Sequence, residues 1–165
     1  MEMRFDVNYT RKSTLRYKGN IKMSGIQDIA DRMTSYIQTK GARPLGESIV
    51  VMHDIEMKSN TIDIEVLMPI NKEIKPDAIF SYLPSFSLGK CAMIRFKGET
   101  YKIGNAYVRL QKFLIKMGIP PQIPMYNVVD IERTDIFGNI HLRDMEIDAY
   151  VKLPEGTPAR WWWGT

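Results

Sequence analysis

The sequence is poor in the residues that build disulfides and metal sites. Of its 165 residues, one is cysteine and two are histidine. The single cysteine, Cys91, excludes an intramolecular disulfide, which is typical of proteins in a reducing compartment. It lies in an apolar run, so we interpret it as a buried structural thiol. Because Cys91, His53 and His141 have no ligand-like spacing, we predict neither a metal site nor a cofactor.

Long apolar runs are also missing. No stretch of about 18 apolar residues is available to span a membrane. The first residues contain no apolar segment of the kind found in signal peptides. We therefore expect a cytoplasmic protein with no membrane partner.

The charge is mildly basic and has no run of one sign. The 23 Lys and Arg residues exceed the 19 Asp and Glu residues by a formal charge of +4, and they are scattered along the chain. This distribution is typical of a solvated surface, whereas a nucleic-acid-binding arm concentrates its basic residues. No segment is left over for a helix-turn-helix unit. We therefore expect no nucleic-acid partner, and we do not expect a complete transcription regulator.

Motifs of nucleotide binding and of common hydrolases are absent. The sequence has no P-loop, no G-x-G-x-x-G and no G-x-S-x-G. His53 shares the face of Ile49 and Val51 on a predicted strand, which favours a packed, hydrogen-bonded histidine. His141 falls in a predicted turn and is expected to be solvated. We predict no catalytic residue from these patterns.

Two pairs of carboxylates leave a choice of interpretations. Asp63 and Glu65 share one face of a predicted strand, and Glu146 and Asp148 occupy the matching place later in the chain. Paired carboxylates can perform acid–base catalysis if burial separates their pKa values. The same spacing is typical of a strand face that meets solvent. It also suits contact with a ligand.

The first predicted helix spans residues 24–40. Ser24 and Gln27 have the spacing of a capping box, in which both side chains satisfy free backbone N–H groups. Gly41 is placed to end the helix in a left-handed conformation. The apolar residues recur at helical spacing and form one stripe: Ile26, Ile29, Ala30, Met33 and Ile37.

A second predicted helix, residues 105–117, repeats this pattern. Its apolar stripe consists of Ala106, Tyr107, Leu110, Phe113 and Leu114. An offset of 77 residues places Leu110 on Met33 and Gly118 on Gly41. A fixed offset of this kind indicates an internal repeat.

Extended segments flank both helices. Each helix follows a segment that ends in an aromatic residue, lysine and glycine, at 17–19 and 96–98. Each helix is followed by two segments with period-two alternation, which predicts half-buried strands. These segments lie near residues 49–55, 62–68, 126–132 and 145–153.

The order strand, helix, strand, strand therefore occurs twice. We predict an α+β fold made by tandem duplication of a β-α-β-β module, with antiparallel sheets, two main helices and pseudo-twofold symmetry. The first module covers 1–75 and the second covers 76–165, including a Trp-rich tail. One such module buries little surface alone, so we expect the two to form one compact unit.

The seam between the modules is the predicted ligand site. Concave seams favour pockets, and tyrosine and methionine suit adaptable apolar surfaces. Core packing is the alternative explanation for the same residues. The candidate ligand-binding residues are Tyr126, Tyr9, Met52, Tyr107, Glu65 and Asp148.

The tail contains three consecutive tryptophans, Trp161, Trp162 and Trp163. Three adjacent side chains cannot all face inward from one short segment. Either one or two of them fill the module seam, or they form a handle for a protein partner or for self-association.

The segments 96–101, 105–118 and 147–153, together with Met125 and Tyr126, resemble the GyrI-like small-molecule-binding superfamily. In the first module, 41–46 and 64–70 fit the same pattern. This superfamily includes the effector-binding domains of multidrug-responsive regulators. The chain also looks similar to an uncharacterised stand-alone group of such proteins from Gram-positive bacteria. The resemblance implies a duplicated fold that binds a small molecule between its halves.

One position departs from the superfamily. Members that bind cations often carry a glutamate shortly before the tyrosine that matches Tyr126, whereas this chain has Pro124 and Met125 there. We therefore expect a small apolar or aromatic ligand. The leading hypothesis is a stand-alone ligand-binding protein with a regulatory or sequestering role. A protein-interaction module is the alternative, and a small hydrolase ranks third.

Overall fold

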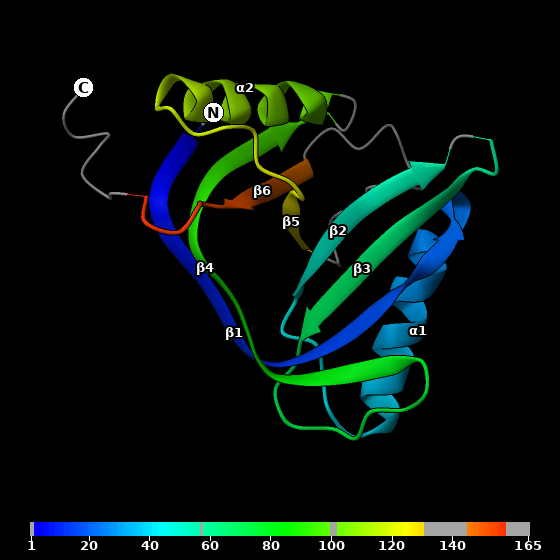
Figure 1. Ribbon diagram of the computed structural model, residues 1–165. Coiled ribbons are helices and arrows are strands. Elements are labelled where there is room, and N and C mark those ends of the chain that lie inside the picture. Colours follow the sequence, from blue (N-terminus) through cyan, green and yellow to red (C-terminus); the bar gives the residue numbers. More distant parts are fainter. Residues whose placement is uncertain (1, 57, 100–101, 131–144, 158–165) are drawn as a thin grey trace.

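The computed structural model describes residues 2–56, 58–99, 102–130 and 145–157, and Figure 1 shows the arrangement of their helices and strands. The elements are β1 Glu2–Lys22, a short 3-10 helix Met23–Gly25, α1 Ile26–Thr39, β2 Glu47–Glu56, β3 Thr61–Pro69, β4 Phe80–Gly98, α2 Ile103–Lys116, β5 Tyr126–Asp130 and β6 Met145–Lys152. The predicted α+β class and the predicted order of elements are confirmed.

Within the described residues, six antiparallel strands close into a barrel in the order β1-β3-β2-β5-β6-β4. The strands β1 and β4, of 21 and 19 residues, run side by side and reach across both halves of the molecule (Figure 1). Their register shifts between Arg4 and Val7 and between Tyr9 and Thr10, and such bulges bend a strand. A second link joins β2 to β5. The two halves therefore share one continuous sheet.

Helix α1 buries the predicted stripe but begins differently from the prediction. Its N-cap is Gly25, and no side chain caps the first turn, so the predicted capping box is wrong. The reason is that Ser24 lies inside the 3-10 turn, whereas a capping serine needs an extended backbone just before the helix. The Gln27 amide instead donates to Asp31 at 3.1 Å. Gly41 ends the helix as predicted, with φ at 74°.

Helix α2 ends in the predicted way. Gly118 has φ at 81°, and the N–H of Ile119 donates to the Leu114 carbonyl at 2.9 Å. This is the backbone reversal that glycine permits at a helix end. Leu110 and Leu114 are fully buried, as are Met33 and Ile37 in α1. The prediction that these four residues belong to the core is confirmed.

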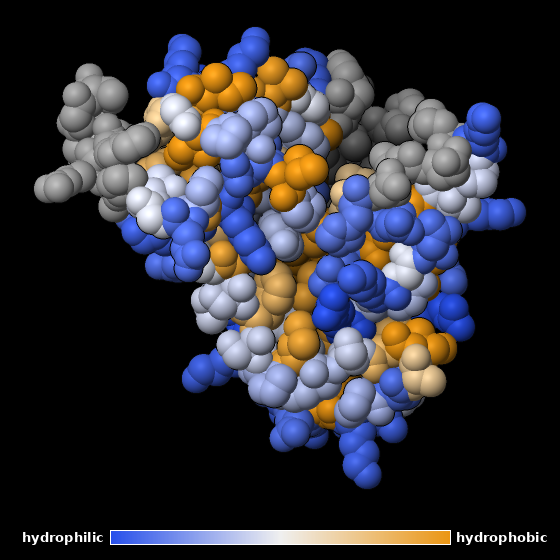
Figure 2. Space-filling view, viewed as in Figure 1, coloured by the Kyte–Doolittle hydropathy of each residue, from blue (hydrophilic) through white to orange (hydrophobic). Residues whose placement is uncertain are grey.

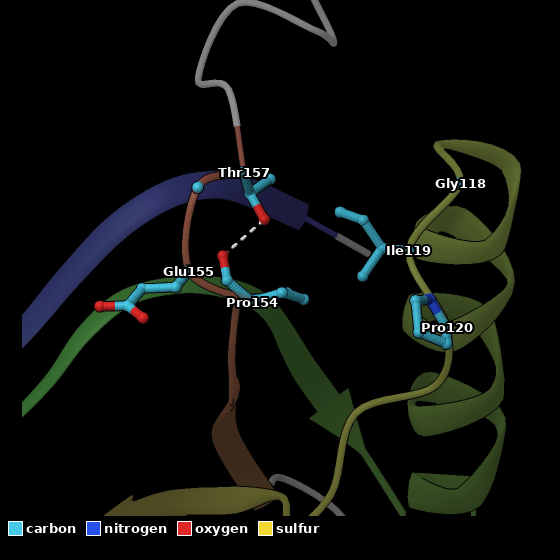
Figure 3. A pocket seen from close by; sticks show the side chains of 7 residues that line it. Gly118, Ile119, Pro120, Pro154, Glu155 and Thr157 are labelled. Carbon is cyan, nitrogen blue, oxygen red and sulfur yellow. Dashed lines mark hydrogen bonds between the residues drawn. The ribbon is translucent and has the colours of Figure 1, made fainter.

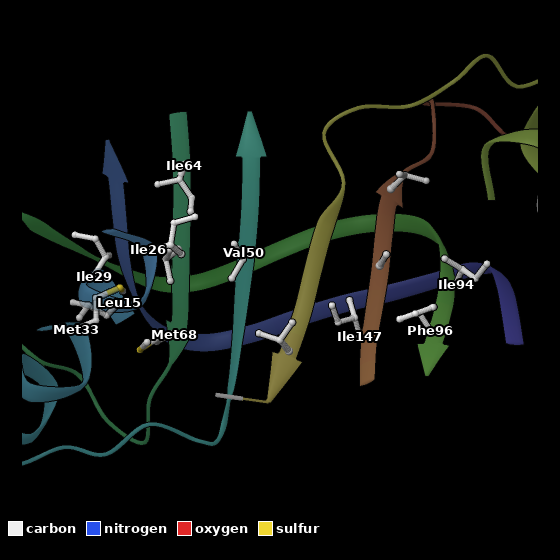
Figure 4. Close-up of a cluster of buried hydrophobic side chains, with 14 of the residues drawn as sticks. Leu15, Ile26, Ile29, Met33, Val50, Ile64, Met68, Ile94, Phe96 and Ile147 are labelled. Carbon is white, nitrogen blue, oxygen red and sulfur yellow. The ribbon is translucent and has the colours of Figure 1, made fainter. Parts of the chain in front are cut away.

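The main core lies between the helices and one face of the sheet. In Figure 4, Ile29 and Met33 of α1 meet Leu15 and Met68 of the sheet, and Ile94 and Phe96 continue the same layer toward the other half. Burying side chains of this size contributes roughly 1.5–3 kcal/mol each. This core fixes which sheet face remains for a site.

Several predictions concern single residues or lie outside the described chain. Cys91 is fully buried, as predicted. His53 is hydrogen-bonded but exposed, so the prediction of a packed histidine is wrong in that respect. None of the helices in the described ranges is long and apolar enough to cross a membrane. The predicted turn with His141 and the tryptophans Trp161, Trp162 and Trp163 lie outside the described residues.

Candidate functional site

The candidate site lies on the sheet face opposite the helices, called the inner face below. Side chains alternate along each strand, so the two faces carry different residues. Val50 and Val66 join the core beneath the helices, whereas Ile49, Val51 and Leu67 belong to a separate buried cluster. That second cluster defines the inner face, to which strands from both halves contribute.

Aromatic side chains fill the middle of the inner face. The Tyr9 ring, only 3% exposed, lies 5.1 Å from the Tyr150 ring and 6.5 Å from the Phe86 ring, measured between centroids. Tyr126 lies opposite Tyr150 in the β5–β6 ladder and is half-buried. Rings at these separations attract one another beyond simple burial. The cluster therefore has a rigid centre and a partly accessible aromatic edge.

A polar triad anchors Tyr9. The Tyr9 hydroxyl donates to Glu47 at 3.0 Å, and Arg11 also donates to the Glu47 carboxylate. The Arg11 guanidinium carbon lies 4.2 Å from the Tyr9 ring centroid, which adds a cation–π contact. Burial, and then the Glu47 charge, raise the pKa of Tyr9 far above its usual range. Tyr9 therefore remains a neutral hydrogen-bond donor.

A second ion pair lies at the end of the inner face near α1. Glu65, with a side chain 13% exposed, approaches Arg16 at 2.9 Å and His53 at 3.3 Å. The buried Arg16 Nε has no well-aligned hydrogen bond, so this contact is mainly an attraction between charges. A cavity of about 420 Å³ opens beside this pair. Its lining residues are Lys18, Gly19, Asn20, His53, Asp63 and Ile64.

A third ion pair lies toward the α2 end. Arg95 donates to both oxygens of Asp148, at 2.8 and 3.0 Å. Glu2 lies 3.2 Å from the same guanidinium. The hydrogen bond and charge of Asp148 raise the pKa of Arg95. Two-point contacts of this kind hold both side chains in fixed positions.

Figure 2 shows the surface from the viewpoint of Figure 1. It dips between the half that contains α2 and the β2–β3 hairpin, and hydrophilic side chains flank the dip. Paler and more hydrophobic atoms lie between these flanks. The pattern agrees with an aromatic centre bordered by ion pairs.

The structure brings four of the six predicted site residues to the inner face: Tyr9, Tyr126, Glu65 and Asp148. Met52 and Tyr107 lie on the helix side, where both pack against the main core. The Tyr107 hydroxyl donates to Asn127 at 2.5 Å, and the Asn127 amide donates to the Val50 carbonyl at 3.1 Å. Ligand binding by any of the six residues stays a prediction.

The inner face also holds cations and a third tyrosine that were not predicted from the sequence: Arg11, Arg16, Arg95, Lys152 and Tyr150. Glu47 was also missed. A partial signal exists for Glu47, since it alternates in step with Ile49 and Val51 on an otherwise apolar strand face. The partners on other strands depend on pairing register, which one sequence does not reveal.

A second cavity, of about 300 Å³, lies away from the inner face (Figure 3). It separates the end of α2 from the turn after β6. Ile119 points across it toward Pro154 and Thr157, and the Thr157 hydroxyl donates to the Pro154 carbonyl at 2.7 Å. Among the described residues that line it, most are apolar and Glu155 is the one that carries a charge. None of the predicted site residues lines it.

No family model and no curated protein matches the sequence. Solved structures do match. The chain is similar to the EcmrR C-terminal domain at a TM-score of 0.58 and 15% identity, over 93% of this chain and 99% of that domain. It is also similar to EcmrR in a cryo-EM structure of the EcmrR–DNA complex, at a TM-score of 0.64 and 13% identity. That match covers 92% of this chain, which spans only 57% of the EcmrR chain. At these identities the likeness establishes the fold.

These matches correct one prediction. The scattered basic residues led us to expect no nucleic-acid partner. A structure that is similar over 92% of this chain is EcmrR bound to DNA. The exclusion of nucleic acid was therefore wrong, because scattered basic residues do not exclude DNA binding by a protein that contains a fold of this kind.

Proposed function

We propose that this chain is a small-molecule-binding domain of the effector-binding type, with a regulatory role. Its binding surface is the inner face, between the two halves of the sheet. The likeness to the EcmrR C-terminal domain over nearly the whole chain supports this role, as does the resemblance to GyrI-like proteins in the sequence.

The observation that carries the proposal is the composition of the inner face. A packed sheet face is normally apolar and closed, yet this one combines half-buried tyrosines with ion pairs. Tyr126 and Tyr150 lie opposite one another and remain partly accessible. Ligand sites are mostly apolar, with a few polar groups that fix orientation. The inner face has this composition.

Preorganisation of the polar groups supports the same role. Arg11 and Glu47 hold Tyr9 in place, and Arg95 and Asp148 hold one another. Fixed side chains lower the entropic cost of binding because few of them must be ordered by the ligand. A ligand would therefore meet a prepared surface. A bound ligand would contact strands of both halves, so binding would be coupled to the arrangement of the two halves.

A thermal-shift panel of dyes and metabolites tests the proposal. A ligand that binds only the folded protein raises the melting temperature by mass action. We expect hits with the wild-type protein, and we expect Tyr126→Ala to abolish them. Tyr36→Ala is the matched control. Tyr36 lies on α1 and packs against Phe80, away from the inner face. A panel without hits, or hits that survive Tyr126→Ala, would reject the proposed site.

Association with nucleic acid is a second candidate, and the EcmrR–DNA complex is the observation that favours it. Fluorescence anisotropy with a labelled duplex tests it directly. Binding through phosphate contacts weakens steeply as salt rises. Binding that is lost at moderate salt would support this candidate, and no change in anisotropy at low salt would reject it for this chain.

A further inference from the structure

The better-buried carboxylates of the inner face are neutralised by the chain itself. Glu47, Glu65 and Asp148 have side chains less exposed than a quarter, at 24%, 13% and 22%. Each contacts an arginine: Arg11, Arg16 and Arg95 respectively. A cationic ligand would have to separate one of these pairs and leave an arginine without its partner. Breaking a buried pair is costly, so these carboxylates do not favour cations.

At the aromatic edge of the same face, the cation of Lys152 has no carboxylate partner among the described residues. Lys152 lies opposite Cys91 in the β4–β6 ladder, and Cys91 belongs to the inner cluster. The Lys152 ammonium lies 5.6 Å from the centroid of the Tyr126 ring. Among the described residues, no carboxylate lies within 4.0 Å of this ammonium. The positive charge at the aromatic edge is therefore available to a ligand.

The tyrosines beside Lys152 supply the second half of a binding site. Tyr126 and Tyr150 face each other across β5 and β6, and both are partly accessible. An aromatic ring can stack on or against such rings at centroid separations of about 4.5–7 Å. The flexible lysine side chain can follow a negative group attached to that ring.

We propose that the inner face binds a planar aromatic molecule carrying a carboxylate or a similar acidic group. The aromatic ring packs against Tyr126 and Tyr150, and the acidic group pairs with Lys152. This inference rests on the proposed function, which it narrows to a ligand class. The arginine-paired carboxylates select against cations, and the free lysine selects for anions.

Three probes of matched size separate charge from shape: naphthoate, naphthalenemethanol and naphthylmethylammonium. Isothermal titration calorimetry gives their affinities for the full chain. We expect naphthoate to bind at least about tenfold more tightly than the ammonium probe, a difference of about 1.4 kcal/mol. Lys152→Gln should weaken naphthoate about tenfold and leave the neutral probe unchanged. Lys112→Gln, which alters an exposed lysine on α2, is the control and should change nothing.

The possible results distinguish this inference from the proposed function. Equal affinities for the three probes, all lost in Tyr126→Ala, would overturn the preference for anions and leave the binding site intact. Tighter binding of the ammonium probe would overturn the preference in the same way. Naphthoate binding that is unaffected by Lys152→Gln would overturn the role of the lysine. No binding of any probe would overturn the inference, and a blank thermal-shift panel would then also reject the proposed function.

Discussion

Thr10 and Ser87 lie opposite one another in the β1–β4 ladder, with their hydroxyl oxygens 3.0 Å apart. Val50 and Asn127 lie opposite one another in the β2–β5 ladder. In both pairs the residue numbers differ by 77, which is the offset that relates the two helix stripes. A residue that pairs with its own counterpart lies on a twofold axis, as in a self-complementary interface. The offset of 77 continues from the helices into β2 and β5 and makes Asn127 the counterpart of Val50, so this pair is what the predicted twofold relation between the halves requires.

We expect the two halves to superpose about a twofold axis. Residues 3–70 should overlay residues 78–153, helix on helix, when the two halves are superposed. The hairpins agree with this, because Val51 lies opposite Glu65 while Val128 lies opposite Asp148. A structure in which α1 and α2 pack in unrelated settings would rule out the duplication and the module boundaries at 75 and 76.

The helices could be predicted because their signal is local. Met33 and Leu110 belong to stripes with helical spacing, and Gly41 and Gly118 end the helices through backbone conformation alone. The start of α1 was not predicted, because Ser24 enters a 3-10 turn that has no distinct sequence pattern. Local rules therefore succeed for periodicity and helix ends, and fail where two local structures compete.

Only part of the site could be predicted, because the alternation of side chains along a strand does not show which face of the sheet packs against the helices. Tyr9 and Tyr126 share one face of the sheet. Met52 and Tyr107 were grouped with them, yet Met52 alternates with Val51 and so must face the other way. Tyr107 lies on the α2 stripe beside Ala106, which indicates core packing. The ion pairs required the register between strands that are distant in sequence.

Leu110→Ala should destabilise the protein by about 2–5 kcal/mol, because it opens a cavity at a fully buried position. Val108→Ala on the same helix is the control. Val108 is 53% exposed, so its change should stay within about 0.5 kcal/mol. Denaturant unfolding measures both. Similar costs for the two variants would mean that α2 is oriented differently from the structure.

Tyr107→Phe should lower stability by about 1–3 kcal/mol, because it leaves the side-chain amide oxygen of the buried Asn127 without its donor. Ligand affinity should not change, since Tyr107 lies on the helix side. The control is Tyr36→Phe, which removes an exposed bond to the Lys75 carbonyl. Chemical denaturation and calorimetry give the two quantities. A loss of affinity with unchanged stability would restore Tyr107 to the ligand site.

Cys91 should give the protein a pH-dependent loss of stability in alkali. Burial raises the pKa of its thiol to about 11, above the roughly 8.5 of an unfolded cysteine. The folded state therefore favours the neutral thiol. This contribution is fully present below about pH 8.5 and is lost as the pH rises toward 11. Across this range the free energy of unfolding should fall less steeply with pH in Cys91→Ala than in the wild-type protein. Identical slopes in the two proteins would contradict this.

The last prediction concerns the triad of Tyr9, Arg11 and Glu47. Arg11→Met removes the cation that pairs with Glu47, whose carboxylate then keeps the hydrogen bond from the Tyr9 hydroxyl. We expect a cost of about 1–3 kcal/mol, typical of a partly buried charge that loses its partner. The double variant Arg11→Met, Glu47→Gln should recover part of that cost, because the remaining amide carries no charge.

A double-mutant cycle measures this coupling by denaturant unfolding. The matched control is Arg32→Met, because Arg32 lies 4.0 Å from Asp28 on the exposed side of α1. Exposed pairs of this kind contribute only about 0.3–0.5 kcal/mol. Equal losses for Arg11→Met and Arg32→Met would show that the Glu47 pair is solvated like a surface pair. The inner face would then lack the preorganised centre on which the proposed binding site depends, and its carboxylates would be open to cationic ligands.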